Sequence, residues 1–437
     1  MINTINKRLI DNSWNYETAN TKGYTHCYHS YPAMMIPQVA RRLIQEYHNK
    51  NTKILFDPYC GSGTSLLEAN LMGINTIGTD LNPLARLIAK SKTTKFEIKI
   101  INDSVKIIES ELAKYNVLKN YSITLFSSEF TDAEVEKIDN YPVPSFPNID
   151  FWFSEYIKLK LAFIKFLIEN KIDSSVRDFF LIPFSETIRE SSYTRNSEFK
   201  LFRIPITKIK EFNVDPFQVF LSKINRNILG LRELIPVLPD DVCTQVFDFN
   251  TCESIPDGIF EEKSVDLIVT SPPYGDSRTT VAYGQFSRLS NQWLGFKDAN
   301  QVDNNLMGGN GSYKKGYLYF ELAKSELNEL KDIDIKRYND VQSFLIDYFN
   351  SIQNISKYIR KGGHVCYVLG NRTVKNIQIP LDLITVEIFS NFGFEHLKTI
   401  IRAIPNKKMP KMNSPTNVRG AVSSTMNNEY IVILRKQ

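Results

Sequence analysis

The sequence predicts an α/β fold built on a doubly wound sheet, mixed but mostly parallel, with a large and mainly helical insertion. Residues 54–56 are a short apolar run that leads through two glycines into a segment with helical spacing. Residues 75–80 are predicted as the next strand one helix later, and a further apolar run is found at 265–270. Strands that alternate with helices form mostly parallel sheets covered on both faces, so these three segments indicate the fold class.

The composition is that of a globular protein. The chain has 437 residues, 42% of them hydrophobic and 23% charged, which is enough for one large or two ordinary domains. No apolar run approaches the length of a membrane span and the polar start lacks a signal-peptide core, so we expect a cytoplasmic protein without a membrane partner. Five scattered cysteines predict neither a metal site nor a disulfide framework. The net charge of +5 is compatible with a nucleic-acid partner but does not require one.

The first strand ends in a turn that is suited to a cofactor. Asp57 and Pro58 end the apolar run, and Gly61 and Gly63 allow a close approach that side chains would block. The glycines lie between the carboxyl end of a strand and the amino end of a helix, where open α/β sheets bind ligands. Leu66 stands where a nicotinamide fingerprint has its third glycine, so that class of cofactor is disfavoured. An ordinary connection between strand and helix is the alternative.

Two further strand ends favour the cofactor site. The second strand ends on Asp80, at about the spacing from the glycine turn at which such folds place the acid that binds a ribose. The third strand is stopped by Pro272 and Pro273, which cannot donate to a sheet. Residues 271–274 must therefore project from the carboxyl edge.

These motifs resemble those of a known enzyme family. The segment Asp57-Pro58-Tyr59-Cys60-Gly61-Ser62-Gly63-Thr64, with Ser271-Pro272-Pro273-Tyr274, is similar to the S-adenosylmethionine motif and the catalytic motif of amino-group DNA methyltransferases. Residues 26–37 resemble the segment that closes over the cofactor in this family, and Tyr59 stands where phenylalanine is commoner. The resemblance covers 12–95 and 242–300 well and the middle of the chain poorly.

The resemblance implies a site-specific DNA methyltransferase of Rossmann-like fold, with S-adenosylmethionine as cofactor and double-stranded DNA as partner. A cognate restriction enzyme is a further partner that it allows, whereas the oligomeric state is not legible. Asp80 is expected on the ribose, Asp248 on the adenine and Tyr31 over the methionine portion. The full cofactor set is Tyr31, Asp57, Tyr59, Gly61, Gly63, Thr64, Asp80 and Asp248, and the catalytic set is Ser271, Pro272, Pro273 and Tyr274.

The catalytic motif suits transfer to an exocyclic amino group, which is a poor nucleophile because its lone pair is conjugated with the ring. The Ser271 side chain and the Pro272 carbonyl can accept its hydrogens, and Tyr274 can stack on a base that has left the duplex. Methylation at carbon 5 of cytosine would need a cysteine after a proline, and the chain has no such pair.

The chain divides into an arm with the first half of the methyltransferase domain at 1–95, the helical insertion at 96–240, and the second half with catalytic motif and flap at 241–437. Within the insertion, basic residues among hydroxyls and amides predict DNA contacts by Arg189, Arg195, Lys200 and Arg203, the alternative being a solvated basic face. A glycine-rich flap at 275–316 and a basic loop at 398–419 are further candidate DNA contacts. The other predicted elements are helices at 34–47, 81–92, 341–360 and 381–392 and strands at 243–249, 364–369 and 429–434.

The most detailed prediction concerns which atom of the base receives the methyl group. Serine before the two prolines resembles the pattern usual among cytosine N4 enzymes, so cytosine is favoured, and adenine N6 is the alternative. A serine can accept from the amino group and donate to the adjoining ring nitrogen of either base, so hydrogen bonding does not separate the two. Methylation of guanine N2 in RNA and an inactive cofactor- or DNA-binding protein are the further alternatives.

Overall fold

The computed structural model describes residues 7–123, 140–196, 198–276, 281–309, 316–404, 412–413, 423–424 and 426–437. Within these ranges, eight strands form the main sheet. From one edge to the other they are β1 (Arg8–Ile10), β9 (Phe394–Ala403), β12 (Asn428–Lys436), β6 (Ile359–Leu369), β5 (Val265–Thr270), β2 (Ile54–Asp57), β3 (Asn75–Thr79) and β4 (Thr244–Phe247).

The sheet is mixed but mostly parallel. Strand β12 runs antiparallel to both of its neighbours, whereas the other adjacent pairs of this sheet are parallel. The predicted fold class is therefore confirmed. Strand β2 has β5 on one side and β3 on the other, so the connections diverge at the carboxyl end of β2, the position at which doubly wound sheets bind ligands.

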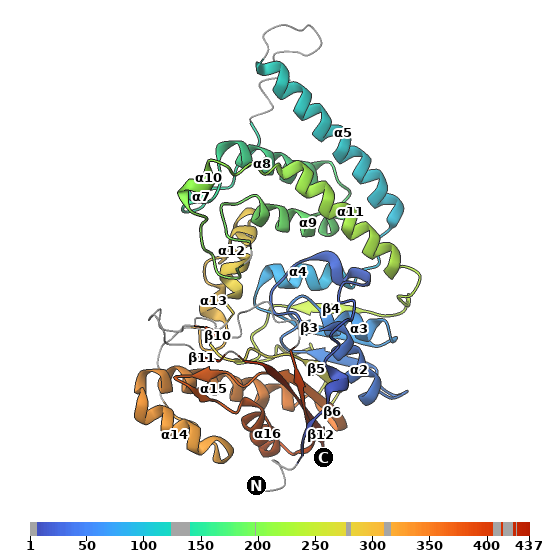
Figure 1. Cartoon of the computed structure of the whole chain (residues 1–437). Coiled ribbons are helices and arrows are strands. Elements are labelled where there is room, and N and C mark those ends of the chain that lie inside the picture. The colour runs from blue at the N-terminus through green and yellow to red at the C-terminus, as the bar shows by residue number, and fades with distance from the viewer. Residues whose placement is uncertain are drawn as a thin grey trace.

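Alternate residues of the strands face opposite sides of the sheet. In β6, Val365 and Tyr367 pack into one hydrophobic cluster, whereas Cys366 and Val368 pack into another. The first face is covered by α14 (Lys324–Ile333), α15 (Ile335–Ser356) and α16 (Leu381–Asn391), and the second by α2 (Pro37–Tyr47) and α3 (Thr64–Asn70) (Figure 1). The central strands are thus buried on both sides, as a parallel sheet requires.

The insertion is mainly helical, and it lies beyond α4 (Pro83–Lys92) from the sheet (Figure 1). Its helices are α5 (Ile98–Ile123), α7 (Ile149–Trp152), α8 (Glu155–Asn170), α9 (Arg177–Glu190), α10 (Ile206–Ile209) and α11 (Pro216–Leu234). All of them except α10 share one hydrophobic cluster with α4 and with α12 (Tyr283–Trp293), so the insertion is packed onto the cofactor half of the sheet. The division of the chain at 96 and 240 stays a prediction.

Most of the other predicted elements are present. The predicted helices correspond to α2, α4, α15 and α16, and the predicted strands to β4, β6 and β12. The remaining short elements are η1 (Asn12–Trp14), η2 (Tyr24–Tyr28), α13 (Val302–Asn305), η3 (Glu321–Ala323), β7 (Thr373–Val374), β8 (Ile377–Gln378), β10 (Met412–Asn413) and β11 (Ser423–Ser424). No helix of the described residues is long and apolar enough to span a membrane.

The loops predicted at 398–419 and 275–316 are wrong in part, because each contains regular secondary structure. The segment at 398–419 begins inside β9, where Arg402 is buried, and its residues 405–411 and 414–419 lie outside the described part. The flap at 275–316 contains α12, whose Trp293 is buried against the helices of the insertion. Residues 277–280 and 310–315 of the flap are likewise outside the described ranges.

Candidate active site

The glycine turn after β2 adopts a backbone that only small residues tolerate. Gly61 and Gly63 have φ angles of 48° and 77°, in the left-handed region. A Cβ on Gly63 would lie 2.8 Å from the Cα of Ala89, so glycine is needed for the close packing of α3 on α4. A Cβ on Gly61 would meet no protein atom within 4 Å and would project into open space. The turn therefore leaves room for a ligand at Gly61 and packs tightly at Gly63.

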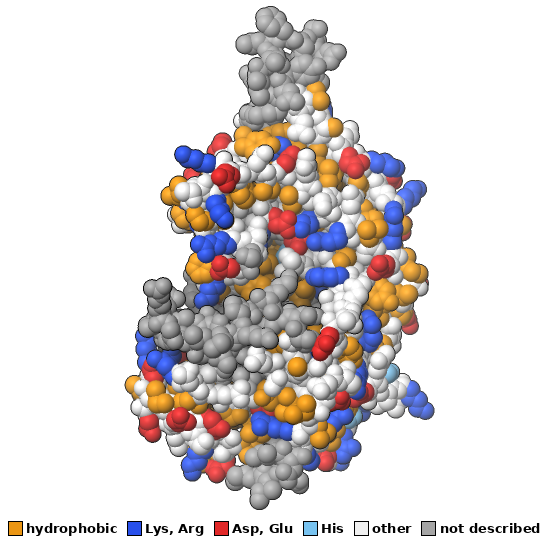
Figure 2. All heavy atoms as spheres, viewed as in Figure 1, with side chains coloured by type: hydrophobic (Ala, Val, Ile, Leu, Met, Phe, Trp, Pro, Cys, Tyr) orange, Lys and Arg blue, Asp and Glu red, His pale blue; other side chains and the backbone are white. Residues whose placement is uncertain are grey.

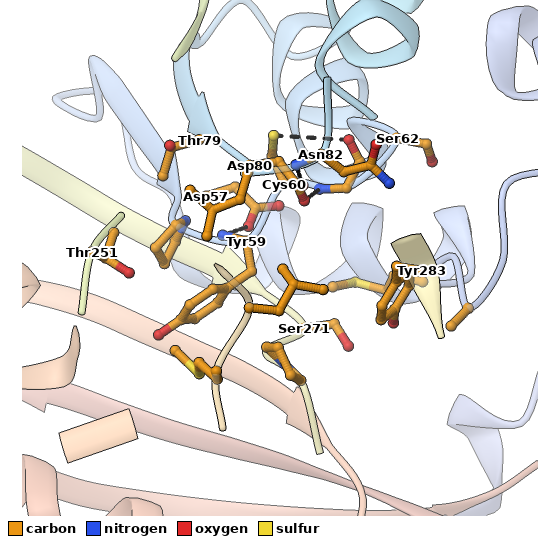
Figure 3. A pocket seen from close by; sticks show the side chains of 18 of the residues that line it. Asp57, Tyr59, Cys60, Ser62, Thr79, Asp80, Asn82, Thr251, Ser271 and Tyr283 are labelled. Atoms are coloured by element: carbon orange, nitrogen blue, oxygen red, sulfur yellow. Dashed lines mark hydrogen bonds between the residues drawn. The ribbon is translucent and has the colours of Figure 1, made fainter. Parts of the chain in front are cut away.

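A cavity opens at the carboxyl ends of β2, β3 and β5 (Figure 3). It has the mixed polar and apolar lining of a cofactor site. The sequence-predicted residues that line it are Tyr31, Asp57, Tyr59, Gly61, Thr64, Asp80, Ser271 and Pro273. Gly63, Asp248, Pro272 and Tyr274 do not line it. The turn, the acid and the start of the catalytic motif are therefore brought to one cavity.

Asp80 is held by the backbone at the end of β3. One carboxylate oxygen accepts from the Gly61 N–H at 3.0 Å, and the other accepts from the Asn82 N–H at 2.8 Å. Burial raises the pKa of Asp80, and these two N–H donors oppose that shift. Each oxygen keeps lone pairs for a second donor, so the carboxylate can also accept from the two hydroxyls of a ribose.

Asp57 lies deeper, at the end of β2. Its carboxylate accepts from the Thr270 hydroxyl at 2.5 Å and from the Tyr59 N–H at 3.1 Å. Burial raises the pKa of Asp57 to about 6, against the lowering effect of these donors. The Tyr59 ring points away from the turn, and its hydroxyl lies 2.5 Å from the Ser351 hydroxyl of α15.

Tyr31 is fixed from two sides. Its hydroxyl accepts from the Asn82 side chain at 2.9 Å, and its ring stacks on Tyr283 of α12 with centroids 6.0 Å apart. The same Asn82 amide donates to Ser287 of α12 at 2.9 Å and accepts from Asn291 at 3.2 Å. Asn82 therefore joins Asp80, Tyr31 of the segment 26–37, and α12 in one buried network.

Several lining residues were missed by the sequence prediction. The sequence analysis places Asn82 in the helix predicted at 81–92, although an amide two residues after the strand-end acid Asp80 lies close enough to join the site. It places Tyr283 in the flap, and the contact of Tyr283 with Tyr31 depends on the tertiary fold. The other missed lining residues include Phe249, Asn250, Thr251, Cys252, Leu306 and Met307.

The contact of Asp248 with the adenine stays a prediction. Its side chain is 79% exposed, lies 3.9 Å from Arg86, and lines a second cavity that shares Phe249 and Asn250 with the first. Strand β4 ends one residue earlier, and the chain then turns so that Phe249 and Asn250 reach the first cavity.

The catalytic motif follows β5 at the rim of the cavity. Ser271 faces the space between the glycine turn and Tyr283 (Figure 3). Its hydroxyl lies 3.1 Å from the hydroxyl of Tyr274, which in turn donates to Glu429 of β12 at 3.5 Å. Burial raises the pKa of Tyr274. The edge thus offers hydroxyl and carbonyl acceptors in a partly buried setting.

The basic segment of the insertion is only partly exposed. Arg189 is buried and donates to the backbone carbonyls of Phe286 and Glu198, so its predicted role as a DNA contact is corrected to an internal one. Arg195 and Lys200 are exposed, whereas the partly buried Arg203 stacks over aromatic rings. Figure 2 shows a hollow between the insertion and the sheet, with hydrophobic side chains inside it and Lys and Arg side chains around it.

The described residues contain no cluster of side chains suited to a metal ion, and their cysteines are free. A glycine turn, a ribose-type acid and an acceptor-rich edge around one cavity define a nucleoside-cofactor-dependent transferase. The open space above Gly61 and the free lone pairs of Asp80 fit the adenosine portion of S-adenosylmethionine.

Comparison with known proteins gives the family. A family model described as DNA methylase matches residues 3–91. The type II methyltransferase M.MvaI of Kocuria varians is 37% identical over 460 residues, covering 100% of this chain and 96% of that protein. The type II methyltransferase M.BsoBI of Geobacillus stearothermophilus is 21% identical, covering 90% of this chain and 82% of that protein. A tRNA (guanine(10)-N2)-dimethyltransferase of Methanocaldococcus jannaschii is 38% identical over 52 residues, which cover 12% of this chain and 15% of that protein.

The full-length match shows that the chain belongs to the family of type II DNA methyltransferases. The cofactor of this family is S-adenosylmethionine.

Proposed function

We propose that the protein transfers a methyl group from S-adenosylmethionine to the exocyclic amino group of a flipped base in a specific DNA sequence, with cytosine N4 favoured, in a restriction–modification or related system. The observation that carries this proposal is the single cavity that Asp57 and Asp80 share with Ser271 and Pro273. A cofactor cradle and an amino-accepting edge on one cavity are what direct transfer to a base nitrogen needs.

In this proposal, Asp80 holds the ribose hydroxyls, and Gly61 with Thr64 leaves room at the amino end of α3. Tyr31 and Tyr59 form the walls, and Asp57 supports the turn from below. When bound, the cofactor supplies an electrophilic methyl group. Transfer forms a nitrogen–carbon bond, returns the carbon–sulfur electron pair to sulfur, and releases one proton from nitrogen to solvent.

The catalytic edge prepares the base nitrogen. The hydroxyl of Ser271 and the carbonyl of Pro272 accept hydrogens of the amino group, which turns its lone pair out of conjugation with the ring. Pro272 and Pro273 have no N–H to compete for these acceptors. Tyr274 is the residue on which the base stacks after it has left the duplex.

The DNA surface is proposed to include Arg195 and Lys200, which are exposed, with Arg203 held by Phe151 and Tyr193 behind them. Lysine and arginine side chains position phosphates without reading sequence. Exposed Phe202 extends the same surface. Both the hollow in Figure 2 and this basic surface suit a duplex partner.

The choice of cytosine over adenine rests on the serine before the two prolines. Adenine presents the same amino group beside a ring acceptor, so N6-methyladenine is the second candidate product. Guanine N2 in RNA is a third, because of the short similarity to a tRNA enzyme.

The test is a labelled methyl-transfer assay run side by side on DNA, RNA and protein, followed by mass spectrometry of the nucleosides. We expect N4-methylcytosine in DNA from the wild type and none from Ser271→Ala. N6-methyladenine alone would overturn the cytosine assignment and keep the enzyme class, whereas label in RNA alone would overturn the DNA proposal. Sequencing modified bases in DNA from an expressing host would identify the target sequence.

A further inference from the structure

A partly buried ion pair lies next to the catalytic motif. Glu429 of β12 and Arg402 of β9 stand opposite each other on antiparallel strands, and the Arg402 guanidinium donates to one oxygen of Glu429. Arg402 is 1% exposed and also donates to the carbonyl of Asn15. The other oxygen of Glu429 accepts from the hydroxyl of Tyr274 at 3.5 Å. The pair therefore connects the far side of the sheet to the catalytic edge.

When Glu429 is ionised, the hydrogen bonds of this chain run in one direction. Burial raises the pKa of Glu429, and the Arg402 guanidinium opposes that shift. An ionised carboxylate has no hydrogen to donate, so the Tyr274 hydroxyl must donate to Glu429. The oxygen of Tyr274 is then left as an acceptor, and the Ser271 hydroxyl 3.1 Å away donates to it. The lone pairs of Ser271 are consequently free. An exocyclic amino group brings two hydrogens and needs acceptors.

We propose that Glu429 is a positioning residue, which acts through Tyr274 to fix Ser271 as a hydrogen-bond acceptor for the target amino group. The inference rests on the proposed function and adds a residue far from the motif in sequence. Hydrogen-bonded chains in a protein interior polarise one another, so the carboxylate also strengthens the acceptor. Ser271 is thereby committed to the amino group, and the adjoining ring nitrogen of the base needs a donor elsewhere.

A purely structural role for the pair is the competing explanation, because Glu429 and Arg402 also join β12 to β9. A partly buried pair of this kind is weak as a source of stability, since desolvation of both charges opposes their attraction. The two roles differ in one respect: only the positioning role passes through the Tyr274 hydroxyl.

The experiment is a double-mutant cycle of Glu429→Gln and Tyr274→Phe, read as the single-turnover rate of methyl transfer to DNA. Each single variant should lower this rate about 10- to 100-fold, the effect of losing one hydrogen bond to a charged group. Affinity for the cofactor should not change. In the Tyr274→Phe background, Glu429→Gln should have no further effect, because the chain is already broken.

The matched control is Asp266→Asn, which weakens another partly buried pair, with Arg360, at the opposite end of β5. It should lower the melting temperature without lowering the rate. Tyr274→Phe leaves the ion pair intact, so it tests the inference even where Glu429→Gln does not fold. Full activity of Tyr274→Phe, or losses that add in the double variant, would overturn the inference. A wild type that methylates no base amino group would overturn the proposed function instead.

Discussion

The hydroxyl of Thr270 donates to the carboxylate of Asp57 across 2.5 Å and joins the ends of β5 and β2. Thr270 precedes the catalytic motif, and Asp57 precedes the glycine turn, so one buried hydrogen bond links the two halves of the site. Both residues are almost inaccessible to water. The geometry of the glycine turn therefore depends on the strand that leads into the proposed catalytic motif.

Asp57→Asn should make the cofactor-free protein more stable above pH 6. Burial raises the pKa of Asp57 from 3.8 to about 6, so the folded protein holds this proton more tightly than the unfolded chain. The resulting stability is present below pH 4 and is lost as pH rises through 6, by up to about 3 kcal/mol. We would measure the free energy of unfolding of both proteins by denaturant at about pH 5 to 8. The difference between the variant and the wild type should grow up to about pH 7 and stay constant above it.

Thr270→Val should raise the pH range over which the Asp57 carboxyl loses its proton in the folded protein. The variant keeps the shape of the side chain and removes the hydroxyl, so the Asp57 carboxylate loses a donor that lowers its pKa. The stability difference is then measured between the Thr270→Val single variant and the Thr270→Val/Asp57→Asn double variant. Its midpoint should lie above the value of about 6 expected for the wild-type background. A midpoint that does not move would contradict this account of the hydrogen bond.

Asp80→Ala should weaken cofactor binding by about 1.5–3 kcal/mol, because the ribose loses a charged acceptor. The variant also frees the N–H groups of Gly61 and Asn82, so Asp80→Asn serves as the control that keeps the size of the side chain. Ser271→Ala should bind cofactor nearly as the wild type does while turnover is lost. If calorimetry showed that Ser271→Ala loses cofactor affinity and Asp80→Ala keeps it, the assignments of Asp80 to the cofactor and Ser271 to catalysis would be wrong.

The sequence predicts the centre of the sheet well, because β2 and β5 are apolar runs and β2, β3 and β5 all lead into the proposed site residues. Parallel strands place their carboxyl ends at one edge, so Asp57, Asp80 and Ser271 must converge without any knowledge of loops. The role of Asp248 stays a prediction, because this residue follows β4 and lines a neighbouring cavity. The chain turns directly after β4, and a local pattern does not show on which side of the turn a side chain emerges.

The parts that the sequence prediction missed depend on distant partners. Arg402 reads as a surface residue in a basic loop, yet in β9 it is buried because Glu429 neutralises it from the opposite strand. Arg189 reads as a phosphate contact, and two carbonyls satisfy it internally. Trp293 lies in a glycine-rich stretch and becomes part of a helix only by packing on the insertion.

The double variant Arg195→Glu/Lys200→Glu should lower DNA affinity and reduce the salt dependence of binding. Each phosphate contact releases counterions, so the slope of log affinity against log salt should fall by about 1.8, the amount expected for two lost contacts. The cofactor affinity should stay the same, since neither residue lines the cavity. Binding titrations between about 50 and 200 mM salt provide the measurement.

Arg189→Met is the contrasting variant on the same segment. Arg189 lies over the ring of Phe286 with 4.3 Å between guanidinium carbon and ring centroid, and it is buried. The variant should destabilise the protein by about 1–3 kcal/mol through the carbonyls that it leaves unpaired. The salt slope should not change. A reduced slope with unchanged stability would return Arg189 to the DNA surface.

Asn82→Ala should weaken both folding and cofactor binding. The buried amide of Asn82 serves Tyr31, Ser287 and Asn291, so its removal leaves several polar groups without a partner. We expect a loss of about 2–4 kcal/mol in the free energy of unfolding, as for unsatisfied buried groups.

The matched control is Asn70→Ala, another fully buried asparagine with side-chain hydrogen bonds, which lies on α3 away from the cavity lining. Both variants should lose stability, because both leave buried partners unpaired. Only Asn82→Ala should also lower the affinity for S-adenosylmethionine, because Tyr31 then loses its hydrogen bond to Asn82 and is held by ring contacts such as that with Tyr283. Thermal unfolding paired with calorimetry separates the two effects. Equal cofactor affinity in the two variants would show that Asn82 supports the fold and not the closing of Tyr31 over the site.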